Sequence, residues 1–235
     1  MEAARELIVE TLGVFALVYV GGSAISTKGT ALIGIGFAHA LILGLNIIIA
    51  GPISGGQLNP AVTLALLITG NLNAIKGVLY IVAQIAGSFL AALCLKFLNP
   101  GGIDGTFPTP TTSALFKINA IQICLLEFIA TFFLVMAVFT GIKTGQSERT
   151  IALMVGGTLL CFIQAIGPFT GASLNPCRTL GPAVITSYLW NHGSQWAYYV
   201  GPLAGGATAG LFSQFLVHSN FGAKKADPKE DGFEM

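Results

Sequence analysis

The sequence predicts an all-α membrane protein with six transmembrane helices and two half-helices arranged as an inverted repeat. Three observations predict this fold. The 235 residues are 54% hydrophobic and 9% charged, whereas about 25% of residues are charged in a soluble domain. Six long apolar stretches follow one another along the chain. An eleven-residue block centred on Asn-Pro occurs twice, with an offset of 116 positions.

The six apolar stretches are the predicted transmembrane helices. Most have the ~20 residues needed to cross a hydrocarbon core of about 30 Å, whereas the fifth is short and has poorly defined ends. The first stretch contains Glu10 and is preceded by Glu2 and Glu6, which is not typical of a cleaved signal peptide. The six stretches are Leu7–Ile25, Ala31–Ala50, Gly77–Leu98, Ile118–Thr140, Ile151–Ile166 and Trp196–Val217.

The two Asn-Pro blocks predict half-helices. The first, Ser54–Leu64, contains Asn59, Pro60 and Ala61, and the second, Thr170–Leu180, contains Asn175, Pro176 and Cys177. Asn is a preferred helix cap and Pro fits the first position of a helix. Helices from Asn59 to about Thr69 and from Asn175 to about Val184 would each be ~15 Å long, about half the hydrocarbon core.

The internal repeat extends beyond these blocks. Glu10 corresponds to Glu127 at an offset of 117, and Tyr80–Gly87 corresponds to Tyr198–Gly205 at an offset of 118. We therefore predict one domain, 1–235, with repeats of about 1–115 and 116–217 and a cytoplasmic tail, 218–235. Each repeat has three spans, an odd number, so the two copies enter the membrane in opposite directions. Lys and Arg are more frequent in one set of alternate loops, which places both termini in the cytoplasm.

The inverted arrangement brings the N-termini of the two half-helices together near the membrane centre. Each N-terminus carries about half a positive charge, so a cation at ~4 Å from both would be disfavoured by on the order of 4 kcal/mol at an effective dielectric of 20. If the Asn oxygens cap their own helices, the amide NH2 groups remain free to donate into a lumen. A central water that accepts from both must turn its hydrogens away, which interrupts proton transfer. The pattern favours a passive pathway for small neutral molecules that excludes ions and protons.

Paired Asn-Pro-Ala-type blocks in a six-span chain, with Arg178 directly after the second, resemble the aquaporin (major intrinsic protein) family. Strings such as Ser54-Gly55-Gly56 and Gly77–Gln84 are most similar to plant tonoplast intrinsic proteins. The resemblance implies the aquaporin-like fold, a water channel and a homotetramer. It also implies that Glu10 and Glu127, which match the family's paired membrane glutamates, support the loops that carry the half-helices.

The resemblance further implies an aromatic/arginine selectivity filter. The family's filter positions fall on His39, Ile163, Ala172 and Arg178. Ile163 and Ala172 would leave a wider and less polar constriction than His and Cys, which favours water together with ammonia, urea or hydrogen peroxide. Glycerol is disfavoured, because glycerol facilitators have Asp where this chain has Thr179. Two departures from the family pattern are Cys177, expected to pack behind the junction or to react with mercury, and Gln57, where the family usually has His.

Other functional classes fit less well. An aquaglyceroporin that passes glycerol is the nearest alternative, and a secondary carrier would have to use Glu10 or Glu127 as its coupling site. A purely adhesive role would require a narrower lumen. No catalytic triad, metal cluster or phosphate-binding loop is evident, so we expect no enzyme activity, cofactor, metal or disulfide. The net charge of +1 gives no reason to expect a nucleic-acid partner. The sequence does not distinguish the plasma membrane from a vacuolar-type membrane.

Overall fold

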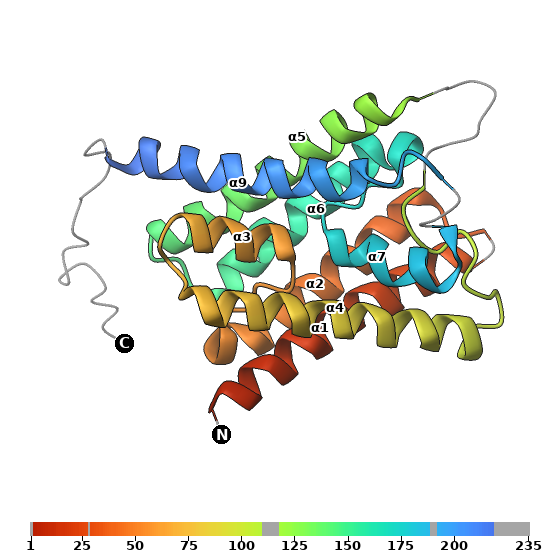
Figure 1. The fold of residues 1–235 in the computed structure, drawn as a ribbon, viewed down its shortest axis with the longest axis horizontal. Helices are drawn as coiled ribbons and strands as arrows, with labels where there is room; N and C mark the ends of the chain where they lie inside the picture. Colours follow the sequence, from red (N-terminus) through yellow and green to blue (C-terminus); the bar gives the residue numbers. More distant parts are fainter. Residues whose placement is uncertain (1, 28, 110–117, 189–191, 219–235) are drawn as a thin grey trace, which may run out of the picture.

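All regular secondary structure in the described part of the chain is α-helical. The computed structural model describes residues 2–27, 29–109, 118–188 and 192–218, so the predicted tail lies outside the described residues except for His218. Within these ranges, eight helices and no strand are present (Figure 1). They are α1 (Glu2–Ser26), α2 (Leu32–Ser54), α3 (Pro60–Ile68), α4 (Ala74–Leu98), α5 (Ala120–Lys143), α6 (Glu148–Thr170), α7 (Pro176–Ile185) and α9 (Ala197–His218).

Six of these helices correspond to the six predicted spans. Among the described residues, α1, α2, α4, α5 and α6 are long and apolar enough to cross a membrane. The sixth predicted span coincides with α9, which has 22 residues and packs along α5. The fifth span, expected to be short, is a helix of 23 residues. Ser147 Oγ accepts a hydrogen bond from Thr150 N at its start, and Gly171 ends it in the left-handed conformation (φ 81°).

The two half-helices lie in the middle of the bundle and are exchanged between the repeats. In Figure 1, α3 and α7 lie between α9 and α4. The half-helix α3 of the first repeat packs on α9 of the second, and α7 of the second repeat packs on α4 of the first. Each repeat therefore holds the half-helix of the other, which fixes both N-termini at the centre of the molecule.

Two equivalent glycines allow the long helices to approach each other closely. A Cβ atom at Gly87 on α4 would overlap the carbonyl oxygen of Thr11 on α1. A Cβ atom at Gly205 on α9 would overlap the carbonyl oxygen of Phe128 on α5. These contacts are related by the repeat, and they are the close backbone approach that small residues permit between membrane helices.

Candidate permeation pathway

Glu10 supports the loop that precedes α3. Its Oε1 accepts hydrogen bonds from Ser54 Oγ (2.6 Å) and from the backbone N–H of Gln57 (2.9 Å). Its Oε2 accepts from the backbone N–H of Leu58 (2.7 Å) and from Gln84 Nε2 (2.8 Å). Glu10 is fully buried. Four donors satisfy this carboxylate, so it fixes the position of an otherwise unpaired loop backbone inside the membrane.

Glu127 has the equivalent position in the second repeat. Its Oε1 accepts from Thr170 Oγ1 (2.7 Å) and the backbone N–H of Ser173 (2.9 Å), and its Oε2 accepts from the backbone N–H of Leu174 (2.8 Å). The two loops are therefore supported in the same way. The difference is that Glu127 accepts three hydrogen bonds from the described residues, whereas Glu10 accepts four.

Two tyrosines also hold these loops, a role that the sequence analysis did not assign. Tyr80 Oη donates to the backbone carbonyl of Ser54 (3.2 Å), and Tyr198 Oη donates to that of Thr170 (2.7 Å). Both tyrosines are almost completely buried. The two tyrosines occupy equivalent positions in the two repeats, at an offset of 118. This equivalence is the sequence signal that could have identified their role.

The supported loops have a strained backbone at matching positions. Leu58 and Leu174 both have φ of 52°, and Ala172 has φ of 50°. Left-handed conformations cost non-glycine residues roughly 1–2 kcal/mol each. The hydrogen bonds to the two glutamates hold the backbone in this form, which directs the chain into the N-termini of α3 and α7.

Asn59 and Asn175 cap the two half-helices. Asn59 Oδ1 accepts from the backbone N–H of Ala61 (2.9 Å), and Asn175 Oδ1 accepts from that of Cys177 (2.9 Å). In each case, Pro occupies the first helical position, which has no N–H to satisfy. The side-chain oxygens are thus used within each half-helix, and the amide NH2 groups point away from it.

The two asparagines also join the repeats to each other. Asn59 Nδ2 donates to the carbonyl of Leu174 (2.9 Å), and Asn175 Nδ2 donates to the carbonyl of Leu58 (2.9 Å). The sequence predicted that each amide NH2 group remains free to donate into a lumen. One of the two is instead used in this reciprocal pair, so each asparagine retains one N–H.

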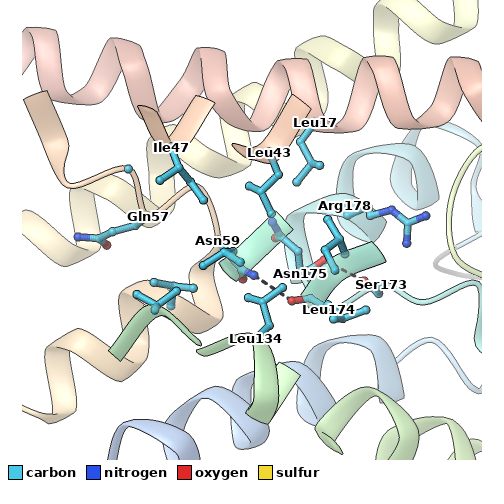
Figure 2. A pocket seen from close by; sticks show the side chains of 15 residues that line it. Leu17, Leu43, Ile47, Gln57, Asn59, Leu134, Ser173, Leu174, Asn175 and Arg178 are labelled. Atoms are coloured by element: carbon cyan, nitrogen blue, oxygen red, sulfur yellow. Dashed lines mark hydrogen bonds between the residues drawn. The ribbon is translucent and has the colours of Figure 1, made fainter. Parts of the chain in front are cut away.

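A central cavity adjoins this asparagine pair (Figure 2). One part of its lining is aliphatic, whereas the other part comes from the two loops and the asparagines. The aliphatic residues are Leu17, Leu43, Ile47, Val62, Leu134, Val138, Val155 and Leu159. The loop and half-helix residues are Gly56, Gln57, Asn59, Ser173, Leu174, Asn175 and Arg178.

Two further cavities continue the central one in opposite directions. The first, which we call the outer cavity, shares Arg178 with the central cavity and is also lined by Ile163 and Gly171. The second, the inner cavity, shares Ile47 and Gln57 with the central cavity. The cavity volumes are about 340 Å³ for the outer, 20 Å³ for the central and 200 Å³ for the inner cavity. The central cavity, beside the asparagine pair, is the smallest of the three, and it shares lining residues with both of the others.

Arg178 separates the outer cavity from the central one. Its Nη1 donates to the carbonyl oxygens of Gly171 (2.8 Å) and Ala172, and its Nε donates to His39 Nε2 (3.0 Å). The side chain is 4% exposed. Three acceptors therefore hold the guanidinium group in one orientation at the boundary between the cavities.

The structure brings the four predicted filter residues to this boundary in unequal roles. Ile163 and Arg178 line the outer cavity, and Ala172 contributes a carbonyl oxygen to Arg178. His39 is fully buried and is not part of the lining of the three cavities. Its Nδ1 lies 2.8 Å from the carbonyl of Ile35, which can only accept, so Nδ1 carries the hydrogen and Nε2 accepts from Arg178.

Cys177 packs behind the asparagine pair. Its side chain is fully buried, and it is not part of the lining of the three cavities. Its carbonyl accepts from Ser88 Oγ on α4, which in turn accepts from the backbone N–H of Gly181 (2.9 Å). The burial of the side chain agrees with packing behind the junction, one of the two roles expected for Cys177.

The fold and the passage define a membrane protein of the inverted-repeat type. The chain belongs to the major intrinsic protein family, whose model matches residues 1–213. It is 42% identical to aquaporin TIP2-3 from Arabidopsis thaliana over 184 residues, which is 77% of this chain and 70% of that protein. It is 34% identical to aquaporin TIP4-4 from Zea mays, covering 97% of this chain and 92% of that protein.

A solved structure agrees with this fold. The X-ray structure of the aquaglyceroporin from Plasmodium falciparum superposes with a TM-score of 0.75, covering 91% of this chain and 95% of that one. The two sequences are 23% identical. At that identity, the similarity concerns the fold alone.

Proposed function

We propose that the protein is a passive water channel. The observation that carries this proposal is the reciprocal Asn59–Asn175 pair, which leaves one N–H on each amide beside the smallest of the three cavities. A water oxygen can accept from both donors, and the aliphatic part of the lining offers it no competing partner. Its hydrogens then point away along the passage, so neighbouring waters cannot pass a proton through this point.

Two positively charged features would exclude cations. The N-termini of α3 and α7 each carry about half a positive charge at the cavity. Arg178 adds a full charge at the boundary with the outer cavity. The protein would therefore pass neutral molecules and repel hydronium and metal cations.

The proposed filter consists of His39, Ile163, Ala172 and Arg178. Ile163 makes the outer constriction apolar, which favours small neutral solutes such as ammonia, urea and hydrogen peroxide in addition to water. The relatives reported above are named aquaporins of the TIP type, which agrees with water as the main permeant. A glycerol channel is the second candidate. It is disfavoured because Thr179 provides no carboxylate at the position where glycerol facilitators have Asp, and its hydroxyl is paired with Ser173 Oγ (2.8 Å).

We also propose an orientation, an oligomeric state and a membrane location for the channel. Both termini would lie in the cytoplasm, and the chain would assemble as a homotetramer in a plasma or vacuolar-type membrane. The repeats would span about 1–115 and 116–217. We propose no enzyme activity for the chain. Many large apolar side chains are exposed, including Leu41, Leu153 and Phe215, and these would face lipid or neighbouring subunits.

The proposal is tested by measuring flux in proteoliposomes. Vesicles containing the purified protein are mixed with a hyperosmotic solution in a stopped-flow light-scattering instrument. A channel gives rapid shrinkage with a low activation energy, and its flux rises linearly with the gradient. A secondary carrier gives slow flux that saturates, and a glycerol channel gives fast reswelling when glycerol is the osmolyte.

A further inference from the structure

Gln57 differs from its counterpart in the second repeat in a way that the proposed function does not explain. The Gln57 side chain is 6% exposed, and its Oε1 is buried without a hydrogen-bond partner among the described residues. The residue at the equivalent position, 116 places on, is Ser173. Ser173 Oγ donates to the carbonyl of Asn175 (2.9 Å) and is paired with Thr179 Oγ1 (2.8 Å). The polar group is therefore satisfied in one repeat and unpaired in the other.

The unpaired amide lies at a defined point of the passage. Gln57 lines both the central and the inner cavity. Figure 2 shows its side chain extending away from the asparagine pair, on the opposite side from Arg178. Gln57 thus stands at the inner end of the central cavity, as Arg178 stands at the outer end.

The groups at the two ends differ in hydrogen-bonding character. Arg178 can only donate, and the free N–H groups of Asn59 and Asn175 also donate. Gln57 is different, because its amide has an acceptor as well as donors. Neither its Oε1 nor its Nε2 has a partner among the described residues, so the amide can turn its oxygen toward the cavities that it lines. Glu148, at the start of α6, lines the inner cavity and adds a carboxylate there. A permeating molecule would first present its acceptor to Arg178 and the asparagines, and then present its donors to Gln57.

We infer that Gln57 is a second specificity-determining residue, which accepts a hydrogen bond from permeating water and from neutral N–H solutes such as urea. This inference rests on the proposed water channel. A buried acceptor without a partner is unfavourable, so the hydrogen bond from a passing molecule offsets the loss of its hydration at this point. Solutes with several donors lose more hydration in the narrow passage, and they depend on this acceptor more than water does.

Three variants separate this role from a simple effect of size. Gln57→Met keeps an unbranched side chain of similar length and removes the amide. Gln57→His keeps a polar group but makes it titratable. Ile47→Met is the matched control, because Ile47 lines the same two cavities and has no polar group to lose. Water and urea permeabilities are measured by stopped-flow light scattering with equal amounts of incorporated protein.

Gln57→Met should lower urea permeability about tenfold and water permeability about threefold, the range expected for losing one net hydrogen bond. Ile47→Met should change the urea-to-water ratio less than twofold. In Gln57→His, urea and water fluxes should fall as the pH decreases through about 6.5, where an imidazole gains a proton and loses its acceptor. The wild type and Ile47→Met should lack this added pH dependence.

The inference is overturned if Gln57→Met leaves the urea-to-water ratio unchanged, if Ile47→Met lowers it equally, or if the wild type conducts water but no urea. A Gln57→His channel whose flux has the same pH profile as the wild type also overturns it, and this result does not depend on how well Gln57→Met folds. If the wild type conducts no water, the proposed function itself fails, which is a distinguishable outcome.

Discussion

Asn59 and Asn175 each donate a hydrogen bond to the carbonyl of the leucine that precedes the other, at 2.9 Å in both directions. They lie 116 positions apart in sequence, yet they form one unit at the centre of the molecule. Each asparagine uses its oxygen to cap its own half-helix and one hydrogen to hold the opposite loop. The pair is therefore a structural joint between the repeats as well as the proposed water site.

This double role predicts a specific result for Asn59→Asp. The carboxylate can still cap α3, but it has no hydrogen to donate to the Leu174 carbonyl. We expect water permeability to fall at least tenfold, because a repulsive carboxylate faces that carbonyl and the donor beside the cavity is lost. Stopped-flow shrinkage gives the permeability, and circular dichroism checks that the helices remain. Unchanged water flux would contradict the role of the amide.

The support of the two loops predicts a similar loss of stability from changing either glutamate. In Glu10→Gln, the new amide NH2 can donate to the Ser54 hydroxyl, which can turn to accept, and it then faces one donor, Gln57 N–H. In Glu127→Gln, the NH2 group can likewise face one donor, Leu174 N–H. Each buried donor without a partner costs about 1–3 kcal/mol.

We therefore expect Glu10→Gln and Glu127→Gln each to destabilise the protein by about 1–3 kcal/mol. Thermal unfolding of both variants in the same detergent, monitored by circular dichroism, measures the two losses. No loss in either variant, or a loss in only one of them, would contradict the equivalent support of the two loops.

The contact between His39 and Arg178 predicts a change in solute selectivity. In His39→Phe, Arg178 Nε loses its acceptor, and the guanidinium group can turn toward the passage. We expect the ratios of urea and ammonia permeability to water permeability to change by roughly tenfold, about the worth of a hydrogen bond to a charged group. His39→Gln, whose amide oxygen can accept from Arg178, should partly restore the wild-type ratios. A solute profile that is the same in His39→Phe and the wild type removes His39 from the filter.

The cysteines provide a test of accessibility. Cys177 is fully buried, whereas Cys161 on α6 is exposed. A thiol reagent added to the protein in detergent should label Cys161 within minutes and leave Cys177 unlabelled until the protein unfolds. Mass spectrometry of the digested protein locates the label. Rapid labelling of Cys177, or loss of water flux upon mercury treatment that Cys177→Ser abolishes, would contradict its placement behind the asparagine pair.

Much of this arrangement could be predicted from the sequence, because the same sequence signals occur in both repeats. The caps at Asn59 and Asn175 and the six spans could be predicted, since local helix signals and hydrophobic length determine them. The hydrogen bonds that the two asparagines donate to the opposite loops could not be predicted, because they depend on the distance between two loops that are far apart in sequence. For the same reason, the resemblance implied the residues of the proposed filter but not the hydrogen bond from Arg178 Nε to His39 Nε2. The unpaired Oε1 of Gln57 could not be predicted either, because it depends on which polar atoms surround the side chain in the folded protein.

The most direct test of the central claim is the temperature dependence of osmotic water flux in proteoliposomes, combined with proton flux reported by an internal pH-sensitive dye. The asparagine pair and Arg178 predict rapid water flux with an activation energy well below that of water crossing the same vesicles without protein. They also predict proton flux no greater than in empty vesicles. Water flux no faster than in empty vesicles, flux that saturates with the gradient, or proton flux that rises with the amount of protein would contradict the account.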